Sequence, residues 1–145
     1  MARFKYKLQN ILNLKETLES QQKNAYSLAA ARVREEEEKL TVLLNRKNEY
    51  ENRLKEVISD TIDLKEISHL KNAIQTMKTM IRDQMFAIKK ARDALEAERR
   101  KLDEIMKERK TFEKLREKAF EEFKHELSVE DMKVTDEFTS FKYSK

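Results

Sequence analysis

An apolar stripe with alternating spacings of three and four residues runs from Ile67 to Phe123 and limits what this chain can fold into. Polar residues interrupt it only at Gln84, Glu98, Arg109 and Arg116. A stripe about two residues wide per heptad is too narrow to cover a globular core, and it is typical of a coiled-coil seam that needs a partner helix. Its apolar members are Ile67, Leu70, Ile74, Met77, Ile81, Ile88, Ala91, Leu95, Leu102, Ile105, Phe112, Ala119 and Phe123.

The composition favours long helices over a compact domain. The 145 residues include no Gly, Pro, Cys or Trp, and 41% of them are charged. Tight turns usually contain Gly or Pro, so a chain that lacks both can reverse its direction only rarely. The absence of Cys also excludes disulfides, thiol catalysis and cysteine-based zinc sites. The predicted fold class is therefore all-α.

One reversal of the chain is expected at residues 59–63, where Ser, Asp and Thr favour caps and turns. Asp63 followed by Glu66 resembles a capping box and directly precedes the stripe. We therefore predict a single domain over residues 1–145, a long two-helix antiparallel coiled-coil hairpin. The expected bounds are about 4–58 for the first helix, 59–63 for the turn, and 64–126 for the second helix, which either continues or breaks near Ser128.

A turn near Thr61 determines which residues face each other across the hairpin. The second helix then has no partner beyond about residue 120, so we expect it to overhang. The expected opposite positions are Tyr50 with Ala73 and Ile74, Leu40 with Asp83 and Gln84, and Phe4 with Ala119 and Phe120.

Aromatic and basic residues gather at the open end of the predicted hairpin. Eight of the eleven aromatic residues lie there, and every charged residue up to Lys15 is basic. A two-helix seam cannot bury so many aromatic rings, which indicates a docking surface. The alternatives are local packing of this end on itself, a solvated basic terminus and a disordered tail. The aromatic residues are Phe4, Tyr6, Phe112, Phe120, Phe123, Phe138, Phe141 and Tyr143.

The sequence lacks the patterns of an enzyme, a metal site or a nucleic-acid-binding surface. His69 and His125 lie near opposite ends of the second predicted helix and cannot share a metal within one chain. A phosphate-binding loop needs glycine, and carboxylates interrupt the basic clusters between Lys89 and Lys110. We therefore expect no catalysis, no cofactor, no metal and no nucleic-acid partner.

The chain also lacks a run of about 20 apolar residues, which a bilayer-spanning helix requires. Its basic N-terminus has no continuous apolar segment of the signal-peptide type. We therefore expect a cytoplasmic protein with no direct membrane insertion.

Four stretches of the sequence resemble one known family over nearly the whole chain. The N-terminal stretch is Phe4-Lys5-Tyr6-Lys7-Leu8-Gln9, followed by Ile11-Leu12 and Leu14-Lys15-Glu16. The others are Leu40 to Leu54, Ile74 to Met77, and Arg109 to Lys118 with Asp136-Glu137 after it. Together they resemble the FliJ family, small soluble proteins of the flagellar type III export apparatus.

The resemblance implies an antiparallel coiled coil similar to the central stalk of rotary ATPases. It implies binding to the hexameric export ATPase FliI in its ring pore and to the export-gate membrane protein FlhA, with a role in recycling export chaperones. Peripheral association with the cytoplasmic membrane would follow from these contacts. A stalk protein of a non-flagellar type III secretion system and a generic coiled-coil scaffold are alternatives.

Two contact sites are expected on this basis. By resemblance, the export-gate contact lies near Leu43, Tyr50 and Met77, which could equally be seam residues. The ATPase-ring contact is expected at the open end, at Arg3, Phe4, Lys5, Tyr6, Lys7, Phe112, Arg116, Phe120 and Phe123.

Overall fold

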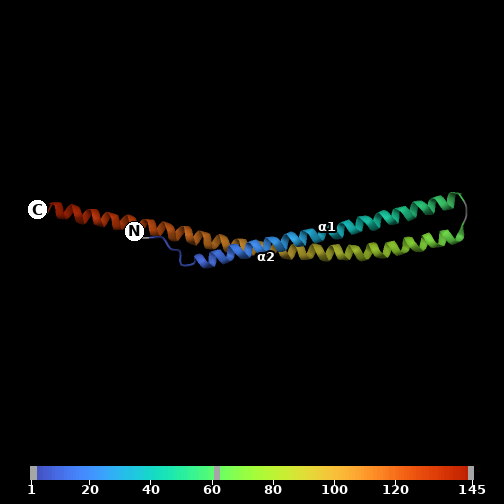
Figure 1. Cartoon of the computed structure of the whole chain (residues 1–145), viewed down its shortest axis with the longest axis horizontal. Coiled ribbons are helices and arrows are strands. Elements are labelled where there is room, and N and C mark those ends of the chain that lie inside the picture. Colours follow the sequence, from blue (N-terminus) through green and yellow to red (C-terminus); the bar gives the residue numbers. More distant parts are fainter. Residues whose placement is uncertain (1–2, 61–62, 144–145) are drawn as a thin grey trace. The chain divides into compact units, whose positions relative to one another are not determined.

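The computed structural model describes residues 3–60 and 63–143, with side-chain surroundings up to residue 139. It contains two helices, α1 over Gln9–Asp60 and α2 over Leu64–Tyr143 (Figure 1). The helices pack against each other in opposite directions, so the predicted all-α antiparallel hairpin is confirmed. Thr61 and Ile62 of the predicted turn lie outside the described residues.

Contacts divide the chain into two compact units. Unit 1 combines Met1–Gln21 with Leu102–Lys145, and unit 2 is Gln22–Lys101. Each unit pairs a segment of α1 with a segment of α2. The expectation that the chain forms a single domain stays a prediction.

Helix α1 begins five residues later than the predicted start at residue 4. Residues 3–6 are extended, and residues 7 and 8 form a turn that leads into the helix at Gln9. The Gln9 amide donates to the Tyr6 carbonyl at 3.0 Å. The late start of α1 agrees with an alternation of period two at its N-terminus, because Phe4 and Tyr6 point to the same side only if residues 3–6 are extended. The half-buried residues are Phe4, Tyr6 and Leu8, and the exposed ones between them are Arg3, Lys5 and Lys7.

Asp63 caps the N-terminus of α2, as the sequence predicted. Its Oδ1 accepts hydrogen bonds from the backbone amides of Lys65 at 3.1 Å and Glu66 at 3.2 Å. These bonds satisfy amides that have no partner within the helix. The Glu66 carboxylate accepts a hydrogen bond from Arg53 Nε of α1 at 3.0 Å, which links the two helices near the turn.

Helix α2 continues through Ser128 without the break that was one of the two predicted alternatives. The expected overhang begins later than residue 120, because Phe4 packs against Phe120 and Phe123. From residue 131 to 139 every side chain is exposed, including Phe138 at 68%. The side chains of Phe141 and Tyr143, which the sequence placed at the open end, lie outside the described residues.

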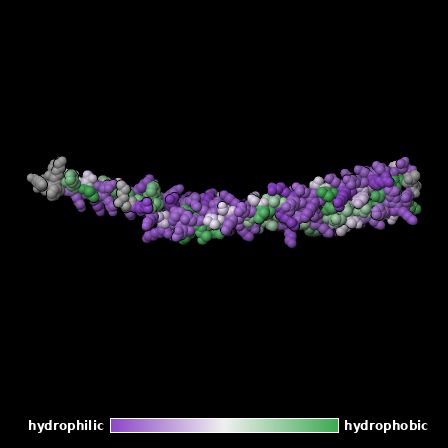
Figure 2. Space-filling model, viewed as in Figure 1, coloured by the Kyte–Doolittle hydropathy of each residue, from purple (hydrophilic) through white to green (hydrophobic). Residues whose placement is uncertain are grey.

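The predicted seam is confirmed, because every apolar member of the stripe is buried or half-buried. The core is nevertheless thin, since no large side chain among the described residues is completely buried. Figure 2 accordingly shows hydrophobic residues as small patches on a largely hydrophilic surface. The buried apolar residues are Leu12, Val33 and Val57 of α1 with Leu70, Met77, Ile88 and Ala91 of α2.

Two polar bridges cross the seam of unit 2. Gln84 Nε2 donates to the Glu36 backbone carbonyl at 2.8 Å and to the Glu36 carboxylate at 2.5 Å. Gln22 Nε2 donates in the same way to the Glu98 carbonyl at 3.0 Å and to the Glu98 carboxylate. Gln84 follows Gln22 by 62 residues, and Glu98 follows Glu36 by the same number. The two bridges are therefore alike, but α2 provides the glutamine in one and α1 provides it in the other. The arrangement links the two helices in one antiparallel register.

The pairing expected from the turn is confirmed at the aromatic end, where Phe4 meets Phe120. In unit 2, Gln84 was expected opposite Leu40. Its hydrogen-bond partner is instead Glu36, which lies about one helical turn before Leu40 on α1.

Candidate functional site

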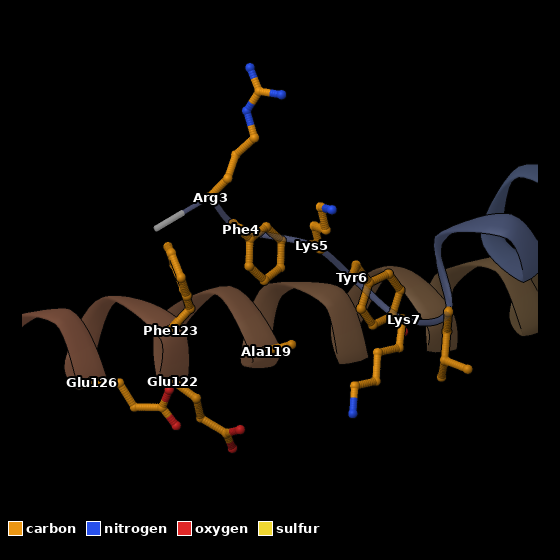
Figure 3. A pocket seen from close by; sticks show the side chains of 10 residues that line it. Arg3, Phe4, Lys5, Tyr6, Lys7, Ala119, Glu122, Phe123 and Glu126 are labelled. Atoms are coloured by element: carbon orange, nitrogen blue, oxygen red, sulfur yellow. The ribbon is translucent and has the colours of Figure 1, made fainter. Parts of the chain in front are cut away.

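The extended N-terminal segment is fastened to α2 by its aromatic side chains. The Phe4 ring lies 5.0 Å from that of Phe120 in an edge-to-face arrangement and 5.5 Å from that of Phe123. The Tyr6 hydroxyl donates to the Phe112 backbone carbonyl at 3.2 Å. Figure 3 shows the Phe4 and Tyr6 rings on the side of the segment that faces α2. All of these residues belong to unit 1.

The same segment displays an unpaired basic edge. Arg3, Lys5 and Lys7 are exposed, and the described residues give none of them an ion pair. Arg3 and Lys5 point away from α2 (Figure 3). Extended chain places successive side chains on opposite sides, so anchoring Phe4 and Tyr6 on α2 turns Arg3 and Lys5 outward.

A hollow of about 540 Å³ lies between the segment and α2 (Figure 3). Ala119 and Phe123 form part of its apolar lining, and Glu122 and Glu126 bring carboxylates to it from α2. The basic edge therefore lies beside an apolar surface and two acidic side chains, which suits a polar protein surface better than a small apolar ligand.

Phe120 also contacts a cationic side chain. Lys124 Nζ lies 4.7 Å from the centroid of its ring, within the range of a cation–π interaction. Arg116, Glu117 and Phe4 line a smaller hollow of about 180 Å³ together with Phe120. Arg116, the polar interruption nearest the end of the stripe, is exposed and takes no part in a buried bridge.

A charged cluster joins the helices next to the aromatic site. Arg109 is paired with the buried Glu19 of α1 and with Glu113 of α2, whose Oε1 lies 2.7 Å from Arg109 Nη1. Hydrogen bonds from Arg109 to Glu113 and Glu19 raise the pKa of the guanidinium. Lys15 Nζ also reaches Glu108 Oε2 at 2.6 Å. The sequence marked Arg109 as a polar interruption, but nothing local distinguished Glu19 from an ordinary solvated carboxylate.

The structure therefore brings together five of the nine residues predicted for the ATPase-ring contact, namely Phe4, Tyr6, Phe112, Phe120 and Phe123. Arg3, Lys5, Lys7 and Arg116 lie exposed around them. Whether this surface contacts an ATPase ring stays a prediction.

The residues predicted for the export-gate contact lie in unit 2 and differ in exposure. Met77 is only 8% exposed and belongs to the seam, whereas Leu43 and Tyr50 are half-buried. Leu43 lines a groove of about 300 Å³ with Val42 and Met80, which are 49% and 40% exposed. Val42 and Met80 could not be recognised as part of this surface from the sequence. Each lies directly beside a seam residue, and only the register of the helices shows that both reach the same groove.

The comparison with protein families agrees with these features. The model of the flagellar FliJ protein family matches residues 4–145. The chain belongs to the FliJ family. FliJ membership indicates a component of the flagellar export apparatus that interacts within that apparatus, and the family is not known as one of enzymes. The FliJ match begins at Phe4, so it includes the extended segment except Arg3, as well as both helices. Neither the search of curated proteins nor that of solved structures found a significant match.

Proposed function

We propose that this chain is a non-enzymatic, cytoplasmic component of the flagellar type III export apparatus that binds the hexameric ATPase FliI through unit 1. The supporting observation is the extended segment, where Phe4 and Tyr6 are held on α2 and leave Arg3, Lys5 and Lys7 unpaired and exposed. Such an anchored row of cations suits an acidic surface. The segment is already ordered by its packing on α2, so binding does not have to cost that conformational entropy again. Binding in the central pore of the ring would promote assembly of the ATPase and couple it to the gate.

We further propose that unit 2 contacts the export gate FlhA. Leu43 and Tyr50 provide partly exposed apolar surface, extended by Val42 and Met80 along the groove. Met77 supports this surface from within the seam. Neither helix, over the residues that the structure describes, has a stretch long and apolar enough to cross a membrane. Peripheral association would therefore come from the gate contact, and recycling of export chaperones would use the same assembly.

The ATPase activity of the cognate FliI, measured with increasing amounts of this protein, tests the proposal. The wild-type chain should stimulate hydrolysis. The triple variant Arg3→Glu, Lys5→Glu, Lys7→Glu should require at least about tenfold more protein for the same stimulation, since it replaces attraction with repulsion.

A matched control carries the same charge change at Arg34→Glu, Lys55→Glu and Lys133→Glu, which are exposed cations without an ion pair among the described residues. It should stimulate like the wild type. Failure of the wild-type chain to bind or stimulate FliI would contradict the proposal, as would an equal loss in both triple variants.

A further inference from the structure

A row of unpaired cations lies on an exposed face of α2 in unit 2. Lys71, Lys78, Arg82 and Lys89 follow one another at intervals of seven, four and seven residues, which keeps them on one side of a helix. All four side chains are exposed, and the described residues give none of them an ion pair. At 1.5 Å per residue the row is about 27 Å long.

Two large apolar side chains lie within this row. Phe86 is 68% exposed and Met85 is 58% exposed. Phe86 follows Arg82 by four residues and precedes Lys89 by three, so it neighbours both cations on the helix surface. We call Lys71, Lys78, Arg82, Met85, Phe86 and Lys89 the basic stripe. Its combination of cations and exposed apolar side chains is typical of a contact surface.

The segment of α2 that carries the basic stripe contains few carboxylates of its own. Residues 71–90 contain five cations and a single carboxylate, Asp83. The resulting charge of +4 equals the net charge of the whole chain.

The cations that follow along α2 are arranged differently. Arg92 reaches Glu37 at 2.9 Å, Arg99 reaches Glu96 at 2.6 Å and Lys101 reaches Glu98 at 3.5 Å. These three cations have carboxylate partners, whereas none is found for the four cations of the stripe in the part of the chain that the structure describes.

The basic stripe is separate from the groove considered for the export gate. Met80 lines that groove and lies two residues from both Lys78 and Arg82. Two residues correspond to about 200° around a helix, so the groove and the stripe lie on different sides of α2. A partner could occupy the stripe and leave the groove free.

We propose that the basic stripe binds an acidic helical segment of a partner protein. The segment would present carboxylates to Lys71, Lys78, Arg82 and Lys89 and apolar side chains to Phe86 and Met85. A single helix is about 10–12 Å wide and can contact this one face of α2 along its length.

A broad anionic surface such as a membrane fits less well. Glu36 and Glu37 of α1 contact Gln84 and Arg92 of α2, which places an acidic part of α1 beside the stripe. Glu35 and Glu38 in that part are exposed, and a planar anionic surface that extended over them would be repelled. The neighbouring carboxylates therefore favour a narrow partner.

A synthetic peptide of about 20 residues tests this proposal. It carries glutamates along one face and leucines beside them, on an otherwise alanine-rich helix. Fluorescence anisotropy of the labelled peptide with the full chain should show saturable binding that weakens with added salt. A second peptide with glutamine in place of every glutamate should bind at least about tenfold more weakly.

The double variant Lys78→Glu, Arg82→Glu should weaken binding of the glutamate peptide at least about tenfold. Its matched control is Lys110→Glu, Lys114→Glu, an exposed pair of cations with the same spacing on α2. Phe86→Ala should weaken binding about threefold or more, whereas Phe138→Ala, which removes an equally exposed ring at 68%, should not. Circular dichroism checks that each variant keeps its helical content.

Three results would overturn the proposal. The first is an equal loss in both charge-reversal variants, which would indicate non-specific attraction. The second is equal binding of the glutamine peptide. The third is binding of the wild-type chain to phosphatidylglycerol vesicles, but not to the glutamate peptide, which would identify the stripe as a membrane-binding surface.

Discussion

Glu36 is a charged side chain at a seam position, where a coiled coil usually has an apolar one. The residue is 4% exposed and accepts hydrogen bonds from Gln84, while Arg32 Nη2 and Lys39 Nζ lie 2.9 Å and 3.4 Å from its Oε1. The hydrogen bond from Gln84 lowers the pKa of Glu36 below its ordinary value of 4.5, with help from the two cations and against desolvation, which raises it. Glu36 thus remains ionised in the seam at neutral pH.

The lowered pKa of Glu36 predicts a pH-dependent stability. A carboxylate with a lower pKa in the folded state stabilises the fold above its unfolded pKa, and this contribution disappears as the pH falls through the folded pKa. Glu36→Gln should therefore have a lower melting temperature than the wild type at pH 7, by a few degrees. The difference should shrink progressively below pH 4.5, the ordinary value for this group.

Thermal unfolding of both proteins, followed by circular dichroism between pH 7 and pH 2, measures this difference. Glu38→Gln is the control, because Glu38 is exposed and has no ion pair among the described residues. A difference between wild type and Glu36→Gln that stays constant over this pH range would contradict the prediction.

At the scale of single elements, α2 could be predicted closely from the sequence and the start of α1 could not. The α2 seam depends on a local periodicity of three and four residues, which is visible without knowing the partner. The segment around Phe4 is extended because it packs against α2, and its period-two alternation was the available signal. The partners of Gln84, Glu98 and Arg109 depend on the register of the hairpin, so Glu36, Gln22 and Glu19 could not be recognised beforehand.

The N-terminal segment should detach when its aromatic anchor is removed. Phe4→Ala eliminates both ring contacts with α2, leaving the Tyr6 hydroxyl bond as the main attachment. Hydrogen bonds of this kind contribute about 1 kcal/mol, too little to order six residues alone. Limited trypsin digestion should therefore cleave after Lys5 and Lys7 at least about fivefold faster in the variant.

The global melting temperature should change by less than about 3 °C, because the segment lies outside the helical seam. Phe138→Ala serves as the control, since no contact of that ring with another aromatic residue is found in the described part of the chain. Unchanged cleavage rates in Phe4→Ala would show that the aromatic contacts do not hold the segment.

At the scale of the whole molecule, the polar seam residues favour a hairpin within one chain over a parallel dimer. Within the hairpin, Glu36 meets Gln84 and Glu19 meets Arg109. A parallel dimer in register would instead place Glu19, Glu36 and Arg109 of one chain opposite the same residues of another. Like charges at a seam are destabilising, so these residues act against the dimer that the apolar stripe alone would allow.

Light scattering coupled to gel filtration should therefore give the monomer mass of 17.4 kDa over a wide range of protein concentrations. The triple variant Glu19→Leu, Glu36→Leu, Arg109→Leu removes the repulsion and extends the apolar seam, so it should form dimers as its concentration increases. Dimers of the wild-type chain at low micromolar concentration would instead indicate that pairing between chains competes with the hairpin. In that case the polar pairs across the seam would not determine whether the chain forms a hairpin or a dimer.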